Sequence, residues 1–336
     1  MASPTPRETV EALEAKAQAQ EADGNRAGLV ETLSTLATLL TELNDESRAR
    51  RTLAQAYQVV QTIADPIADP QGMAQALHQL GSLYHLQGGW DRSLELYHRA
   101  LALQQDAKDR IGMATTLGRI AAVCQGKGEF RKALETYEES LALKMELQDE
   151  QGLPLTWNNI GTVKGRMGDW SGAMEAFEKS LQMQEVLGDT RGKAVTLANI
   201  GGIHQRQGKW REALRALEQA LALHEVLGDA MGMATTLNTL GFVQRRFGDL
   251  DGAYQRYARA RDLMQASGDP LRVTIPVYNM ALIHEERGEY REALSRMEEV
   301  IAIDKRIGHP DLRQDLETFG RIREKLDRQR DQHASG

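Results

Sequence analysis

The sequence is poor in cysteine and proline and has no long apolar run, and these absences narrow the class of protein. Its single cysteine, Cys124, excludes a framework of intrachain disulfides and favours a reducing compartment. No apolar run reaches the length of about eighteen residues that a membrane span needs, and the first residues lack the apolar centre of a signal peptide. We therefore expect a cytoplasmic protein without a membrane partner.

The charge balance gives no support for binding to nucleic acid. The chain has 41 Lys and Arg against 48 Asp and Glu, a net charge of −7, and a mean hydropathy of −0.49. A modest negative charge provides no bulk attraction to phosphate backbones or anionic lipids. The eight prolines are few for 336 residues, so long helices are not excluded.

What the sequence does contain is a forty-residue unit written six times between Gln71 and Gly308. One column is always glycine, and the column two residues later is aromatic or leucine. The glycines are Gly88, Gly128, Gly168, Gly208, Gly248 and Gly288, and the second column holds Trp90, Phe130, Trp170, Trp210, Leu250 and Tyr290. A repeat of this period is one supersecondary unit stacked on copies of itself, so the chain is predicted to be a solenoid.

Each unit is predicted to contain two antiparallel helices. In the unit from Gly168 to Gly208, apolar residues recur at helical spacing over 169–187 and again over 193–206. Asp189 is placed to cap the second of these helices, and Gly208 to end it in a left-handed conformation. Small and large columns face each other between the helices, as at Gly81 and Tyr97. These columns let neighbouring helices approach closely.

The repeat resembles a known family. The residues Leu77, Leu80-Gly81, Tyr84, Ser93, Tyr97 and Ala100, and later Trp157, Ile160-Gly161, Ala173, Phe177 and Ser180, resemble the tetratricopeptide signature. The forty-residue period is similar to that of kinesin light chains and G-protein-signalling modulators. The resemblance implies an all-α fold, a right-handed superhelical α-solenoid of antiparallel helix pairs, in which the first helix of each pair lines a concave groove.

The ends of the array differ from the repeats, which predicts five segments. These are an N-terminal capping helix (1–24), a degenerate repeat and joint (25–70), six repeats (71–308), a C-terminal capping helix (309–329) and a disordered tail (330–336). The joint carries a doubled Ile-Ala-Asp-Pro sequence over 63–70, whose two prolines should open it. The second cap is apolar at Leu312, Leu316, Phe319, Ile322 and Leu326. Pro154 should be tolerated in the first turn of its helix, whereas Pro276 should shorten its own.

No constellation of catalytic residues is present, so we predict a protein that is not an enzyme and has no metal and no cofactor. The sequence has no Walker A loop, no G-x-S-x-G and no dinucleotide fingerprint. The segment His284-Glu285-Glu286 begins like a zinc-protease motif but has no second histidine. The aromatic column is interpreted as packing between helices, with a binding box as the alternative. Cys124 is interpreted as a structural thiol, with a redox site as the alternative.

The candidate binding residues are polar residues on the first helices, beside the buried positions. They are Gln79, His85, Arg119, Gln125, Asn159, Arg166, Asn199, Gln205, Arg206, Asn238, Arg245, Arg246 and Asn279. An asparagine amide offers donors and an acceptor to an extended strand, and the resemblance implies this role for Asn159 and Asn199. Arg166, Arg206 and Arg246 share one column, and guanidinium groups bind carboxylates in pairs of hydrogen bonds. The alternative is that these arginines only balance nearby Asp and Glu.

Three functions fit this pattern. The first is an adaptor that binds a peptide or a helix of a partner protein, one that is acidic or has a free C-terminal carboxylate. The second is a self-associating scaffold, such as a homodimer. The third is a ligand-gated regulator that acts on a separate effector chain.

Overall fold

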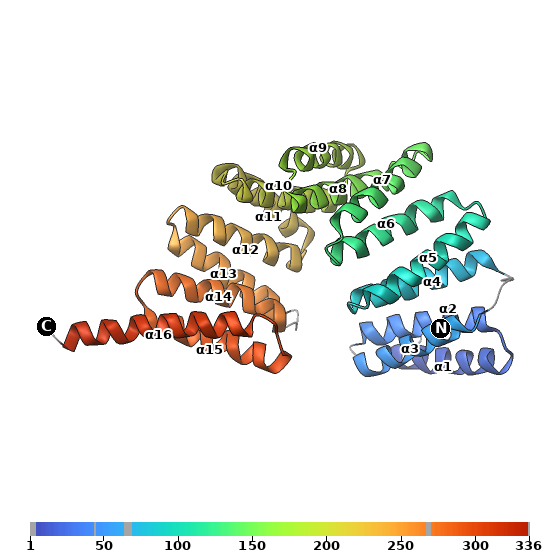
Figure 1. Cartoon of the computed structure of the whole chain (residues 1–336), viewed down its shortest axis with the longest axis horizontal. Coiled ribbons are helices and arrows are strands. Elements are labelled where there is room, and N and C mark those ends of the chain that lie inside the picture. The colour runs from blue at the N-terminus through green and yellow to red at the C-terminus, as the bar shows by residue number, and fades with distance from the viewer. Residues whose placement is uncertain (1–4, 44, 64–68, 267–269, 335–336) are drawn as a thin grey trace. The chain divides into compact units, whose positions relative to one another are not determined.

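The chain is an all-α solenoid, as the repeat predicts. The computed structural model describes residues 5–43, 45–63, 69–266 and 270–334, and within them it forms sixteen helices and no strand (Figure 1). The chain divides into two compact units, residues 1–176 and 177–336, and the division falls within helix α9.

The helices of both units are similar in length and follow one another through short turns. The first unit contains α1 (Pro6–Ala22), α2 (Arg26–Glu42), α3 (Glu46–Gln61), α4 (Pro70–Leu86), α5 (Trp90–Asp106), α6 (Arg110–Gly126), α7 (Phe130–Glu146), α8 (Leu153–Met167) and the start of α9 (Trp170–Leu187). The second contains the rest of α9, α10 (Thr190–Arg206), α11 (Trp210–Leu227), α12 (Ala230–Arg246), α13 (Leu250–Ala266), α14 (Pro270–Glu286), α15 (Tyr290–Ile307) and α16 (Leu312–Ala334).

From α2 onward the helices pack as consecutive pairs, beginning with α2 and α3. We call the first helix of each pair the A helix and the second the B helix, so α4 is an A helix and α5 is a B helix. The closest packing is between partners, such as α4 with α5 and α6 with α7 in the first unit and α12 with α13 in the second. Successive A helices also contact each other: α4 contacts α6, α6 contacts α8, and α12 contacts α14. Within the described part of each unit, B helices have no comparable contact with one another. The A helices therefore form the more closely packed row of each unit.

An aspartate caps the start of most A helices, and a glycine three residues later makes room for it. The Asp69 carboxylate accepts a hydrogen bond from Gly72 N at 2.9 Å, and Asp189 does the same from Gly192 N at 2.8 Å. A Cβ atom added at Gly72 would lie 2.3 Å from Asp69 Oδ2. The predicted cap at Asp189 is confirmed, and the cap explains why this glycine column recurs.

The turns that follow the A helices end in left-handed glycines, as predicted for Gly208, whose φ is 71°. The turns that follow the B helices use the same conformation at Gly188 and Gly228, with φ of 67° and 63°. The first two repeats place Lys108 and Gln148 in that column, with φ of 56° and 54°. A side chain other than glycine is strained there by about 1–2 kcal/mol.

We expect Lys108→Gly and Gln148→Gly each to raise the free energy of unfolding by about 1 kcal/mol, because glycine adopts this conformation without strain. The same change at Lys132, inside α7, should lower it by about 1 kcal/mol through loss of helix propensity. Urea denaturation of the three variants measures both signs. Destabilisation by Lys108→Gly would show that the left-handed residue carries no strain.

Small and large residues interlock between the two helices of a pair. A Cβ atom added at Gly81 in α4 would lie 2.8 Å from Tyr97 Cε1 in α5, and Gly241 meets Tyr257 at the same distance. Ser93, which stands where later repeats have alanine, donates a hydrogen bond to the Gly81 carbonyl at 2.8 Å. The predicted packing role of these columns is confirmed.

The proline in the last repeat does not act as predicted. Pro276 lies inside α14, yet this helix has 17 residues, as many as α12. The predicted shortening is therefore wrong. Proline removes only one backbone donor, and the buried neighbours Val273 and Val277 hold this stretch against the rest of the unit.

The two ends of the array differ from the predictions in detail. Helix α16 continues to Ala334, so the prediction of a disordered tail from residue 330 is wrong up to that point. This stretch of α16 contains no glycine or proline that would end it. The cap also buries a different face at its start, because Asp315 and Thr318 are buried while Leu316 is 44 % exposed. Most of the doubled Ile-Ala-Asp-Pro sequence, residues 64–68, lies outside the described residues.

Candidate functional site

Four of the predicted binding residues line one cavity of the first unit. The cavity has a volume of about 570 Å³ and lies against three consecutive A helices, α4, α6 and α8, and the B helix α7. The predicted residues in its lining are His85, Gln125, Asn159 and Arg166, and the others are Ala122, Gly126, Gly128, Phe130 and Tyr137. The structure thus brings together polar residues that lie about forty residues apart in sequence.

The floor of this cavity is built by Tyr137, whose ring is buried between the helices of the second repeat. Its hydroxyl donates a hydrogen bond to Gln125 Oε1 at 3.3 Å, which orients the amide. Burial raises the pKa of the Tyr137 hydroxyl, so it stays protonated and keeps this bond. Tyr137 belongs to the column of Tyr97, which is predicted only to pack between helices. Its hydroxyl, which the phenylalanine and leucine of the next two repeats lack, was the available signal.

The charge of the cavity is positive. Arg166 is exposed on the last turn of α8, and within the described residues no ion pair joins it to an acidic side chain. Arg119 on α6 is also exposed and acts electrostatically on the same region. Burial and then the Arg119 guanidinium lower the pKa of His85, so its imidazole is neutral at pH 7. The cavity therefore offers amide and imidazole groups beside a guanidinium without a carboxylate partner.

Gln79 lines a second cavity of the same unit, about 500 Å³ in volume, near the start of α4 and α6. The wall includes Gln104, whose Oε1 accepts a hydrogen bond from the Thr116 hydroxyl at 2.8 Å. Gln79 is exposed but does not line the cavity of Asn159 and Arg166. The predicted binding residues of this unit that line a cavity are therefore divided between two cavities.

Several predicted binding residues of the second unit are used inside the fold. Asn279 Nδ2 donates a hydrogen bond to Asn238 Oδ1 at 3.2 Å, so one donor and one acceptor of this pair are used within the fold. Arg245 donates through Nε and Nη2 to Glu286 Oε1, the first bond being 2.9 Å long. Arg245 therefore has an acidic partner within the fold, although it lies outside the column of Arg166, Arg206 and Arg246 for which charge balance was the alternative.

The arginine column is not uniform either. The Arg246 guanidinium lies over the Trp210 ring, 5.4 Å from its centroid. Arg206 is exposed on α10, while Asn199 and Gln205 on the same helix are half-buried. Arg166 belongs to the first unit, and Arg206 and Arg246 belong to the second. One residue of the column therefore lines a cavity, and another covers an aromatic ring.

Two members of the aromatic column pack against the next A helix, while a third, Phe130, lines the cavity of Gln125 and Asn159. A Cβ atom at Gly126 would lie 3.8 Å from the Trp90 ring, and the Trp210 and Phe242 ring centroids are 6.4 Å apart. Cys124 is buried, and burial raises the pKa of its thiol, which disfavours the reactive thiolate. Both observations support packing roles.

The described residues provide neither a cluster of metal ligands nor a membrane-spanning helix. No group of three or more His, Cys, Asp or Glu side chains in this part of the chain is arranged to hold a metal ion. None of the described helices combines the length and apolar character needed to cross a bilayer.

The profile of the tetratricopeptide repeat family matches residues 72–146, 153–225 and 232–306, which is more than half of the chain. The chain belongs to this family. No curated protein matches the sequence of this tetratricopeptide repeat protein.

Solved structures share the fold of this tetratricopeptide repeat protein at low sequence identity. The apo form of RapI is 15% identical with a TM-score of 0.63, covering 83% of this chain and 98% of that one. A Rap protein complexed with Competence and Sporulation Factor is 14% identical with a TM-score of 0.63, covering 95% and 94%. Aspartyl phosphate phosphatase F from Bacillus subtilis is 12% identical with a TM-score of 0.59, covering 96% and 95%. These likenesses show the fold alone.

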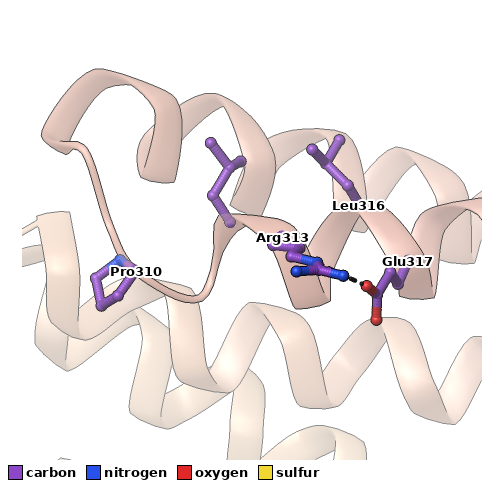
Figure 2. Close-up of a pocket in the computed structure, with 5 residues that line it drawn as sticks. Pro310, Arg313, Leu316 and Glu317 are labelled. Carbon is purple, nitrogen blue, oxygen red and sulfur yellow. Dashed lines mark hydrogen bonds and ion pairs between the residues drawn. The ribbon is translucent and has the colours of Figure 1, made fainter.

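Sequence reasoning missed a third group of polar residues in the second unit. Asp304 on α15 and Asp315 on α16 are both buried, and they line a cavity between α14, α15 and α16. The repeat alignment could have indicated Asp304, because it stands in a column that has the polar residues Gln104 and His224 in other repeats. Pro310, Leu316 and the Arg313–Glu317 ion pair line a separate pocket at the start of α16 (Figure 2).

Proposed function

We propose that this protein is a non-enzymatic adaptor that binds a peptide of a partner protein along the A helices, in a reducing compartment such as the cytoplasm. The observation that carries the proposal is the first-unit cavity lined by Gln125, Asn159 and Arg166. Repeat arrays present extended surfaces to partners. The forty-residue period supports the finer likeness to kinesin-light-chain repeats.

The chemistry of this cavity favours an anionic group in an extended peptide. Arg166 supplies a guanidinium without an internal carboxylate partner, and Asn159 and Gln125 supply amides that can pair with a peptide backbone. A free C-terminal carboxylate combines both needs, since it is an anion attached to the last peptide unit. We therefore place the C-terminal end of the partner segment at Arg166.

A regulator gated by a ligand is the second candidate. It is favoured by the Rap protein whose solved structure is a complex with Competence and Sporulation Factor, because that protein shares this fold over nearly the whole chain. In this function the bound peptide would alter contacts with a separate effector. The same cavity would carry the binding, so one experiment addresses both candidates.

The test is selection of peptides with free C termini from a synthetic library, followed by titration calorimetry. Arg166→Ala should weaken the selected peptides about 10–100-fold, because a charge-assisted pair of hydrogen bonds is lost. Arg50→Ala on the B helix α3 removes the same charge from an exposed ion pair and should change affinity less than about threefold. Equal losses in the two variants, or selection of no peptide by the wild type, would reject the proposed site.

A further inference from the structure

The cavity between α14, α15 and α16 holds two buried carboxyl groups that the proposed peptide groove does not use. Its volume is about 380 Å³. One part of its wall is apolar, with Ile275 and Val300, and another is acidic, with Asp304 and Asp315. The remaining lining residues are Arg272, Thr274, Tyr278, His309, Asp311 and Gln314.

Asp304 is the residue that the fold leaves unsatisfied. It is 1 % exposed, and its Oδ1 has no hydrogen-bond partner. Its Oδ2 lies 3.9 Å from His309 Nδ1, which is longer than a hydrogen bond. A buried carboxylate oxygen without a donor is costly, so a ligand that donates a hydrogen bond to Asp304 Oδ1 would be stabilised here.

The side chain at the equivalent place has a partner in two other repeats, whereas the amide oxygen of Gln184, in the same column, has none. In the first unit, Gln104 accepts a hydrogen bond from Thr116, and the turn residue is Asp109. In the fourth repeat, His224 Nδ1 lies 3.0 Å from Asp229 Oδ2. The last repeat reverses the two chemical types, with the acid on the helix and the histidine, His309, in the turn.

A second acidic residue, Asp315, lies in the same cavity. The first buried residue of α6, α10 and α12 is an alanine, whereas that of α16 is Asp315, which is 6 % exposed. Burial, and then the neighbouring Asp304, raise the pKa of Asp315 to about 7. Asp315 therefore holds a proton near neutral pH beside the carboxyl group of Asp304, and a bound cation can take the place of that proton.

We propose that this cavity binds a primary ammonium group carried on an aliphatic chain. Asp304 and Asp315 accept hydrogen bonds from the ammonium, and the methylenes pack against Ile275 and Val300. The ligand is either a lysine side chain of a partner protein or a free alkyl diamine, which present the same chemistry. The proposal is independent of the peptide groove in the first unit.

The test is titration calorimetry of the full chain with three probes: 1,5-diaminopentane, Nα-acetyl-lysine amide and the neutral control 1-pentanol. Binding of an amine at pH 7 should release a proton, so the measured heat should change with the ionisation enthalpy of the buffer. The tighter of the two amines identifies the source of the ammonium. Pentanol should not bind.

Variants of both acids decide the assignment. Asp304→Asn and Asp315→Asn should each weaken amine binding at least tenfold, while Gln104→Asn, at the equivalent place of the first unit, should leave it unchanged. Circular dichroism confirms that each variant folds, and Asp315→Asn removes a buried acid, so it should fold at least as well as the wild type. Failure of both amines to bind at millimolar concentration, or binding that survives both aspartate substitutions, would overturn the proposal.

Discussion

Replacing Gly201 with leucine is expected to lower the free energy of unfolding of the second unit by about 3 kcal/mol or more. A Cβ atom at this position would lie 2.5 Å from Leu217 Cγ and 3.4 Å from the Ala213 carbonyl oxygen, so α10 and α11 would have to separate. Overpacking of a core contact by even a few methylenes costs about 1–3 kcal/mol, and a leucine adds four carbon atoms. The glycine is therefore required by the close approach of the two helices.

The adjacent glycine provides a matched control. Gly202 lies in the same helix, and apart from its chain neighbours and the nearby backbone of α10, no atom lies within 4 Å of the position where its Cβ would be. Gly202→Leu should stabilise the helix by up to about 1 kcal/mol through propensity alone. Thermal and urea unfolding of the two variants should therefore shift in opposite directions. A similar loss at both positions would mean that these glycines serve flexibility and not packing.

The stability of the C-terminal end is expected to fall as the pH rises from 5 to 7. The pKa of Asp315 is about 7 in the folded chain and 3.8 in its ordinary state, so the folded chain holds a proton that the unfolded chain has released. A group with a raised pKa of this kind destabilises the folded state increasingly above pH 4 and no further above pH 7. The slope is about 1.4 kcal/mol per pH unit, which gives a loss of about 2–3 kcal/mol over this range.

The groups that face Asp315 come from three places. They are Asp304 on α15, His309 and Asp311 in the turn before α16, and Arg272 on α14. Asp315→Asn should flatten the pH dependence of unfolding between pH 5 and pH 8 and raise stability at pH 8. Urea unfolding at both pH values measures this. A wild type that is as stable at pH 8 as at pH 5 would contradict the raised pKa of Asp315.

The sequence was sufficient for the fold because packing fixes the residues that recur. Gly81 must face Tyr97, and Gly72 must leave room for the carboxylate of Asp69, so these columns keep their identity and reveal the helix pairs. Pro276 misled the prediction because tertiary packing overrode a local preference. Leu316 misled it because helical spacing alone did not reveal that Asp315 turns inward in the last helix.

The candidate site was predicted only in part. Helical spacing placed the polar residues on the A helices, and the structure gathers His85, Gln125, Asn159 and Arg166 around one cavity. Spacing could not show which side chains would find partners within the fold. The Arg245–Glu286 ion pair, for example, joins residues 41 positions apart on neighbouring A helices. The spacing of a residue therefore indicates the helix face on which it lies. Its neighbours in the fold decide whether its side chain can bind a partner.

The proposed carboxylate site at Arg166 is tested most directly by a comparison of one selected peptide as its free acid and as its C-terminal amide. The wild type should bind the acid at least tenfold more tightly than the amide, because only the acid can pair with the guanidinium. Arg166→Ala should bind the two forms with equal affinity. Equal binding of the two forms by the wild type, or an undiminished preference in Arg166→Ala, would contradict the site.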